Sequence, residues 1–250
     1  MKPTYLDCNA TTPIDQEVLE TVVHYLEEEF GNSGSRTHIY GQQANKAVSN
    51  ARKQIADLVN CDSDEVLFTS GATESNNLVF FGLEEFARRT NKTHIISSQI
   101  EHKAVLEPLD KLSNNGFDVD LLEVDHSGKV NSKDLERAIR EDTFLISIMH
   151  ANNETGIIQP IDDIASIAKD KNILFHTDAA QTYGKEIAAL ENEDIDMISF
   201  SGHKIYGPKG IGGLILRRNK EMLINESKIK LDQLHNLKSS ILDAAFRGEL

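Results

Sequence analysis

Cysteine is scarce in this sequence, which has only two among 250 residues. Cys8 and Cys61 lie far apart and lack the C-x-x-C spacing of a metal site or a redox pair. A fold held together by disulfides needs more cysteines than this, and a free thiol most often packs as a small hydrophobic side chain. The sequence therefore predicts two unpaired thiols and no cysteine-bound metal.

Basic residues are also few, since 26 Lys and Arg stand against 40 Asp and Glu, giving a formal net charge of −14. A large nucleic-acid surface needs clustered Lys and Arg to replace counterions, so this balance argues against one. The sequence contains no run of roughly 18 apolar residues, the length of a membrane helix, and its first residues do not resemble a secretory signal. We expect a cytoplasmic protein without a membrane span.

Short apolar runs alternate with helical patterns along residues 1–218, as is typical of a layered α/β domain. Strands separated by helices favour a mostly parallel sheet with helices on both faces, and ligands of such sheets bind at the carboxyl ends of the strands. Helices are predicted at 16–29, 42–60, 73–88, 103–114, from about 132 onward, and at 162–171. Strands are predicted at 65–69, 94–97, 118–122, 145–150, 173–177, 197–199 and 213–216.

The pattern changes in residues 219–250, which we expect to be a helical tail of different origin. Leu231, Leu234, Leu237 and Ile241 recur at intervals of three and four residues, the spacing of an amphipathic helix. Gly248 would end this helix.

Lys204 is the strongest candidate for a chemical site, because it closely follows the predicted strand 197–199. A lysine there can form an imine with an aldehyde cofactor if burial and nearby positive charge keep part of its amine neutral. Ser201 and His203 could donate hydrogen bonds to a phosphate. A single lysine in a loop is usually only solvated, so the neighbouring residues decide the matter. The glycine-rich stretch 207–213 opens no helix and is predicted to be a structural turn.

Asp178 directly follows the predicted strand 173–177. A carboxylate placed beside a pyridine nitrogen keeps that nitrogen protonated and makes the ring an electron sink. Gln181 could then bond the ring oxygen. Alone, Asp178 could equally cap the next helix.

Three more segments follow predicted strands. The free N–H groups of Ala72 and Thr73 open a helix whose positive end suits a phosphate, although an ordinary helix start would look the same. His102 offers an imidazole that could stack on a flat ring and shuttle protons, although a lone histidine is more often structural. Asn153 could bond a ring hydroxyl, with Gly156 allowing close approach of the backbone.

In combination these motifs resemble the cysteine desulfurases, which are class-V, fold-type-I enzymes that depend on pyridoxal phosphate (PLP). The resemblance runs in order over about residues 4–218. It rests on the segments 5–13, 30–38, 69–76, 101–105, 152–154 and 199–213.

The resemblance implies a role for each candidate residue. Lys204 would hold PLP, Asp178 would pair with the ring nitrogen, and His102 would be the acid–base group stacked on the ring. Asn153 and Gln181 would bind the ring oxygen. The phosphate would be held by the remaining candidates, Ala72, Thr73, Ser201 and His203.

The same resemblance implies a homodimer that converts L-cysteine to L-alanine. The sulfur would pass through an enzyme cysteine to an acceptor thiol or an iron–sulfur scaffold. A sibling PLP enzyme, such as a selenocysteine lyase or a transaminase, would share this large domain and stays open as an alternative.

The sequence departs from that family after Arg218. Desulfurases continue into a small C-terminal domain whose mobile loop carries the sulfur-accepting cysteine. Here the last 20 or so residues resemble the end of type I restriction-modification specificity subunits, the one feature that hints at a nucleic-acid complex. We expect a truncated or recombined chain in which neither Cys8 nor Cys61 replaces the missing nucleophile. A turnover-defective binding or dimerisation module is therefore a second alternative.

Overall fold

One sheet of seven strands forms the centre of the computed structural model, which describes residues 3–217. The strands are β1 (Val66–Thr69), β2 (His94–Ser98), β3 (Asp118–Leu122), β4 (Thr143–Ser147), β5 (Leu174–Asp178), β6 (Met197–Ser201) and β7 (Gly212–Leu216). Across the sheet they lie in the order β1-β7-β6-β5-β4-β2-β3.

The strands β2 to β6 are mutually parallel, whereas β7 runs antiparallel to both β6 and β1. This confirms the predicted mostly parallel sheet. The exception has a local cause, because β7 returns from β6 through the glycine-rich turn without a crossover helix. The turn packs closely, as predicted: a Cβ added at Gly212 would lie 2.6 Å from the Gly71 Cα, so only glycine fits there.

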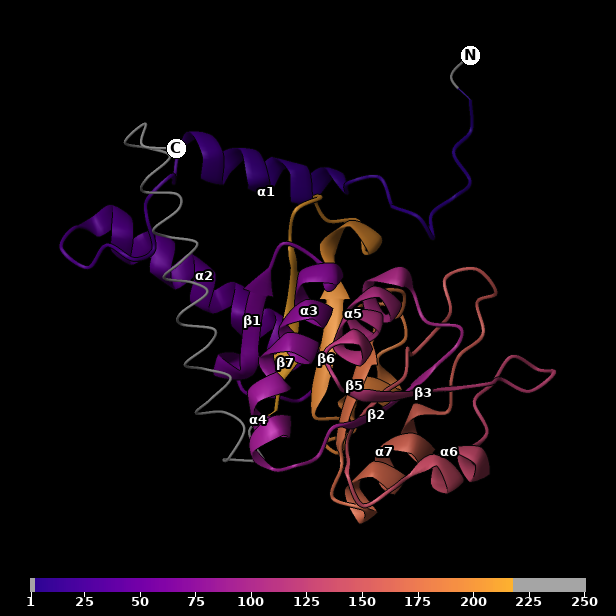
Figure 1. Ribbon diagram of the computed structural model, residues 1–250. Coiled ribbons are helices and arrows are strands. Elements are labelled where there is room, and N and C mark those ends of the chain that lie inside the picture. Colours follow the sequence, from indigo (N-terminus) through magenta and orange to yellow (C-terminus); the bar gives the residue numbers. More distant parts are fainter. Residues whose placement is uncertain (1–2, 218–250) are drawn as a thin grey trace.

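Helices cover both faces of the sheet (Figure 1). They are α1 (Gln16–Glu27), α2 (Ile39–Asp57), α3 (Ala72–Gly82), α4 (Glu84–Arg89), α5 (Lys103–Asn114), α6 (Ser132–Ala138) and α7 (Ile161–Asp170). Helices α3, α4 and α5 pack on one face, and α2, α6 and α7 pack on the other.

Alternation along the strands divides the core into these two layers. Ile95 and Leu145 belong to the cluster under α3 and α5, whereas the next residues, Ile96 and Ile146, belong to the cluster under α7. All four side chains are fully buried. Successive side chains of a strand point to opposite faces of the sheet, so a parallel strand covered on both faces needs apolar residues at neighbouring positions.

Most predicted boundaries lie within two residues of those in the structure, and three predicted elements differ by more. The helix expected at 73–88 is two helices, because α3 ends at Gly82 and a new helix begins at Glu84; glycine is a poor helix former. The helix expected at 42–60 runs from Ile39 to Asp57, since the His38 side chain caps it three residues earlier. The strand expected at 145–150 is β4, which begins two residues earlier, at Thr143, and ends three residues earlier, at Ser147. The predicted tail helix at 219–250 lies outside the described residues.

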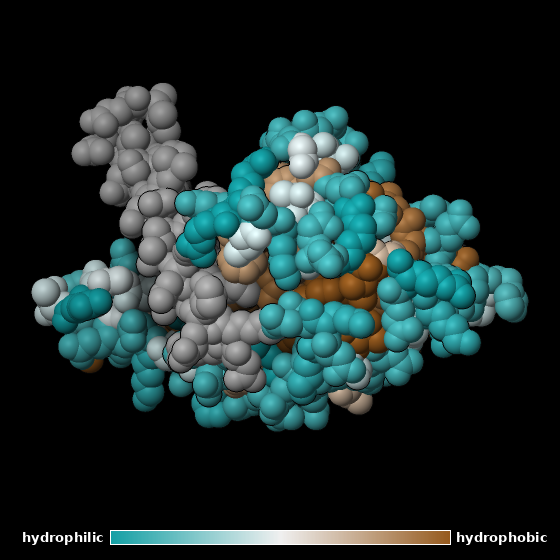
Figure 2. Space-filling model, turned by 60° about the horizontal axis from the view of Figure 1, so that its bottom comes forward, coloured by the Kyte–Doolittle hydropathy of each residue, from teal (hydrophilic) through white to brown (hydrophobic). Residues whose placement is uncertain are grey.

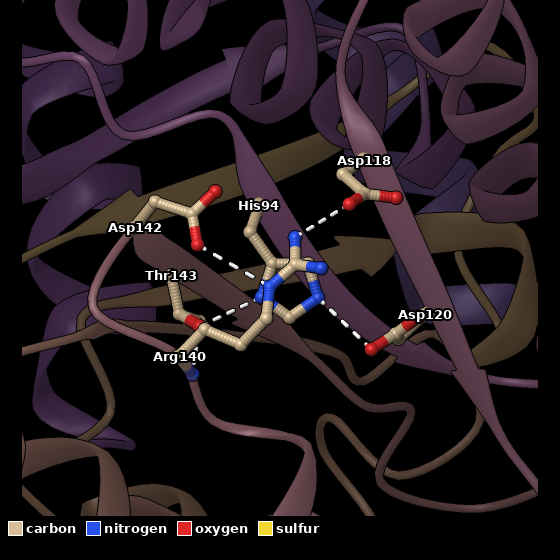
Figure 3. Close-up of polar contacts among 6 residues, drawn as sticks. All are labelled: His94, Asp118, Asp120, Arg140, Asp142 and Thr143. Carbon is tan, nitrogen blue, oxygen red and sulfur yellow. Dashed lines mark hydrogen bonds and ion pairs between the residues drawn. The ribbon is translucent and has the colours of Figure 1, made fainter.

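Hydrogen bonds and ion pairs between polar side chains connect the strands β2, β3 and β4 near their amino ends (Figure 3). Fully buried His94, which begins β2, bonds Thr143 Oγ1 through Nδ1 at 2.7 Å and Asp120 through Nε2 at 3.1 Å. Arg140 pairs with Asp118 at 2.7 Å. Burial, aided by the charge of Arg140, lowers the pKa of His94. A neutral histidine therefore links β2 with β3 and with the start of β4, at the end of the sheet opposite to the carboxyl ends.

None of the helices within residues 3–217 is long and apolar enough to cross a membrane. Seen from below, the surface is mostly hydrophilic, with apolar residues showing between the hydrophilic ones in one region (Figure 2).

We expect Leu145→Ala to destabilise the fold by about 2–5 kcal/mol, because it leaves a cavity in the centre of the sheet, where Leu145 is 0% exposed. The matched change Leu121→Ala, on the edge strand β3 where the side chain is 41% exposed, should cost about 1 kcal/mol or less. Urea unfolding of both variants checks this. Equal losses would contradict the described layering.

Candidate functional site

The carboxyl ends of the parallel strands border a cavity of about 610 Å³. Its walls come from distant parts of the chain, including the segments at 10–11, 70–74, 149–153, 178–181 and 201–210. All nine residues predicted for the cofactor site line it: Ala72, Thr73, His102, Asn153, Asp178, Gln181, Ser201, His203 and Lys204. Tertiary structure thus brings the predicted set into one place.

The N-terminus of α3 forms one wall of this cavity. The helix begins at Ala72 after Gly71, and within residues 3–217 no side chain caps it. A Cβ added at Gly71 would lie 3.6 Å from Ser201 Oγ, so this turn faces the end of β6. The N–H groups of Ala72 and Thr73 in the first helical turn, together with the hydroxyl groups of Thr73 and Ser201, form a donor set suited to an anion.

Lys204 lies half-buried in the short 3-10 turn Gly202–Lys204 that follows β6. Its Nζ donates a hydrogen bond to the carbonyl oxygen of Asn9. Partial burial lowers the pKa of Lys204; the carboxylate of Asp178 opposes this shift and the charge of Lys185 adds to it. A lowered amine pKa increases the neutral fraction, which is the form that attacks an aldehyde.

Asp178 ends β5 and is 5% exposed. Its Oδ2 accepts a hydrogen bond from Asn76 Nδ2 at 2.8 Å, and its Oδ1 accepts one from the Ala180 N–H at 2.9 Å. The chain continues as a turn at 180–185 rather than a helix, so the helix-cap alternative for Asp178 is wrong. The two bonds fix the carboxylate in one orientation at the cavity wall.

His102 has a structural contact as well as a place in the cavity wall. As the N-cap of α5, its Nδ1 accepts a hydrogen bond from the Ala104 N–H at 3.1 Å. A ring nitrogen that accepts carries no proton, so the neutral imidazole holds its proton on Nε2. The capping bond thereby selects the tautomer of His102.

The N-terminal segment lines part of the cavity through Ala10 and Thr11 and bonds several site residues, which the sequence did not predict. The carbonyl oxygen of Asn9 also accepts a bond from Gln181 Nε2 at 2.9 Å, and Asn9 Nδ2 donates to the Asn153 carbonyl at 3.2 Å. Thr11 Oγ1 lies 3.2 Å from the His203 Nδ1. The segment contacts the site partly through backbone oxygen atoms, which leave no residue-type signal in a sequence.

Asn76 was also missed as a site residue, although the segment 69–76 was singled out. It lies one helical turn beyond the start of α3, is fully buried and holds Asp178. Helical spacing from Ala72 would have placed it on the same face of the helix. The close approach of the backbone to a ligand at Gly156 stays a prediction; the φ of +72° favours glycine there, and nothing lies within 4 Å of a Cβ built at this position.

The two thiols are unpaired, as predicted. Burial, with the charge of Glu65 adding to it, raises the pKa of Cys61 to about 11. A protonated thiol is a weak nucleophile. Cys8 is exposed and directly precedes Asn9, whose carbonyl oxygen accepts a bond from Lys204. Residues 3–217 contain no cluster of three His, Cys, Asp or Glu side chains suited to a metal.

The residues present fit pyridoxal phosphate in their chemistry. An amine of lowered pKa suits the aldehyde, a buried carboxylate suits the pyridine nitrogen, and the uncapped helix with its hydroxyl groups suits the phosphate. The carbonyl oxygen of the buried Asn76 side chain has no hydrogen-bond partner in the described part of the chain. An acceptor is therefore left beside Asp178 for a donor group of a ligand.

Comparison with known proteins gives close relatives. The mitochondrial cysteine desulfurase of Saccharomyces cerevisiae is 50% identical over 217 residues, which are 87% of this chain and 44% of that protein. Cysteine desulfurase IscS of Buchnera aphidicola is 49% identical over 225 residues, which are 89% of this chain and 55% of that protein. The chain thus spans about half the length of these curated relatives.

Solved structures give the same result. A structure described as SspA in complex with cysteine is 45% identical, with a TM-score of 0.81 over 88% of this chain and 63% of that one. The crystal structure of DndA from Streptomyces lividans is 50% identical, with a TM-score of 0.78 over 88% and 61%. The predicted fold and the resemblance to cysteine desulfurases are confirmed. The aminotransferase class-V family model matches residues 4–230, and the chain belongs to this family.

Proposed function

We propose that this chain carries the PLP-binding domain of a cysteine desulfurase, which forms L-alanine from L-cysteine and passes the sulfur to an acceptor. The observation that carries the proposal is the convergence of Lys204, Asp178, His102 and the start of α3 on one cavity. Two curated relatives near 50% identity are named cysteine desulfurases, and one solved relative is described as a complex with cysteine.

PLP, on which class-V enzymes depend, supplies an electron sink for the substrate carbon that bears the amino group. Lys204 would hold the cofactor covalently, and Asp178 would pair with the ring nitrogen. Asn153 and Gln181 would bind the ring oxygen. Donors for the phosphate would be the Ala72 N–H and the side chains of Thr73, Ser201 and His203.

The remaining steps assigned to this chain are proton movements and orientation. His102 would hold or release a proton at Nε2, because its Nδ1 is engaged by the α5 backbone. Asn76 would keep the Asp178 carboxylate turned toward the ring. Asn9, which accepts a bond from Lys204, would release that amine when the cofactor binds.

The sulfur would leave through an acceptor thiol or an iron–sulfur scaffold protein. The high pKa of the Cys61 thiol, about 11, argues against that residue as the first acceptor. This favours a second candidate function, a module that binds the cofactor without completing turnover. Cytoplasmic location stays a prediction, since one of the relatives above is mitochondrial. A role of the tail in a nucleic-acid complex also stays a prediction.

A homodimer is part of the proposal. Helix α1 lies above the sheet in the view of Figure 1. None of its residues is buried, and large apolar side chains on it and beside it are exposed. Among them Leu26 is 71% exposed and Phe30 is 69% exposed. Contiguous exposed apolar surface usually marks an interface, and a second copy of the chain is the occupant proposed here.

Lys204→Ala should abolish covalent attachment of PLP, because the proposal assigns the aldehyde to the Lys204 amine and not to Lys209, the other lysine that lines the cavity. Wild-type chain incubated with PLP and reduced with borohydride should give a stable adduct on the peptide that contains Lys204, as measured by mass spectrometry. Lys103→Ala, an exposed lysine at the start of α5, should keep the adduct. An undiminished adduct in Lys204→Ala would refute the assignment.

The purified chain, supplied with PLP, L-cysteine and a reductant, should form alanine and sulfide in equal amounts. We expect Cys8→Ser and Cys61→Ser to change the rate by less than about twofold, a barrier change well below 1 kcal/mol. A collapse of the rate in Cys8→Ser would make that thiol the acceptor. PLP binding without alanine formation would favour the module instead.

The mass in solution should be twice the chain mass of 27.9 kDa, as measured by light scattering. Leu26→Glu should shift the protein toward monomer, because it places a charge in the proposed apolar interface. Ile158→Glu, a matched change at a side chain 44% exposed elsewhere, should leave the dimer intact. A monomeric wild-type chain would contradict the proposal.

A further inference from the structure

Glu101 is a buried carboxyl group beside the cavity that the proposed mechanism does not use. It is 6% exposed and directly precedes His102. Its Oε1 accepts two hydrogen bonds, from Ser98 Oγ at 2.7 Å and from the Met149 N–H at 2.8 Å. Ser98 ends β2 and Met149 follows β4, so one oxygen atom joins two neighbouring strands at their carboxyl ends.

The same loop has a second tie to the segment after β4. Asn152 Nδ2 donates to the Ile100 carbonyl at 2.9 Å. Met149 and His102 both line the cavity. The contacts of Glu101 therefore help to position two residues that line the cavity. Met149 bonds Glu101 directly, and His102 follows it in the sequence.

The second carboxyl oxygen of Glu101, Oε2, is buried and has no hydrogen-bond partner within residues 3–217. An ionised carboxylate would leave a charged oxygen there without a donor, whereas a neutral acid leaves only a hydroxyl group, which costs less. Burial raises the pKa of Glu101 to about 8; the bonds from Ser98 and Met149 oppose this shift, and the charge of Asp178 adds to it.

We propose that Glu101 is a positioning residue that works as a neutral carboxylic acid. It holds the His102 loop against the end of β4 without placing a second negative charge beside Asp178. This inference rests on the proposed function in one respect, namely that Asp178 and His102 are taken to serve the cofactor.

The neutral form gives stability a defined pH dependence. The folded pKa lies above the value of 4.5 for an ordinary glutamate, so folding favours the protonated state. The stability that Glu101 contributes is fully present below about pH 4.5 and is lost as the pH rises to about 8. Asp178, at the end of β5, is the charged group that acts on Glu101. Above pH 8 the two carboxylates repel each other.

The test compares apparent melting temperatures of the full chain without cofactor from pH 5 to pH 9. Glu101→Gln keeps the oxygen that accepts both bonds but cannot ionise, so its advantage over wild type should grow by several degrees up to about pH 8 and then level off. Glu107→Gln, at an exposed position on α5, should follow the wild-type curve. A Glu101→Gln curve parallel to wild type would overturn the proposal.

A second measurement reports on the cavity. Glu101→Ala, which loses both bonds, should lower the yield of the borohydride-trapped Lys204 adduct at pH 7, and Glu101→Gln should restore it. If Glu101→Gln lost as much adduct as Glu101→Ala, an ionised Glu101 would be required and the inference would fail. If wild type formed no adduct, the proposed function would fail, while the melting curves would still decide the state of Glu101.

Discussion

The parallel pairing of β5 with β6 is the contact on which the site depends. Its register sets Asp178 opposite Ser199, so the carboxylate at the end of one strand lies beside the turn that carries Lys204. The return of β7 through tightly packed glycines holds that turn in place, since Gly212 lies against Gly71 at the start of α3. The carboxyl ends of these neighbouring strands thus fix the positions of the Lys204 amine, the Asp178 carboxylate and the start of α3.

His176, which lies behind these strand ends, is neutral and has hydrogen-bond partners on both ring nitrogens. Fully buried His176 bonds Ser147 Oγ at 2.9 Å and Ser199 Oγ at 3.0 Å, and burial lowers its pKa to about 3. This histidine joins β4, β5 and β6 two residues before Asp178. With His176 neutral and Glu101 protonated, Asp178 would carry the negative charge of this group of buried side chains. That charge acts more strongly on Lys204 because the setting is poorly solvated.

Backbone atoms of the N-terminal segment form hydrogen bonds with residues of the site. The Asn9 carbonyl accepts from both Lys204 and Gln181, and the Thr12 N–H donates to the His203 carbonyl at 2.8 Å. The position of the N-terminal segment therefore depends on its hydrogen bonds with the turn Gly202–Lys204. Substitutions in this segment would act by moving Lys204 and His203 rather than by removing a reacting group.

The layered α/β fold and the shared location of the nine cavity residues could be predicted from the sequence, because apolar runs mark strands buried between two helix layers and the polar residues that follow these strands meet at their carboxyl ends. Local patterns could not place the break after Gly82 or the early start of α2, which depend on one weak residue and one capping side chain. Only the folded structure shows the contacts of Asn9, the hydrogen bond between Asn76 and Asp178, and the burial of Glu101. Each of these features brings together residues that lie dozens of positions apart in the sequence. The groups that meet are a backbone oxygen, a side-chain amide and a carboxyl group shielded from water, and no linear pattern encodes such contacts.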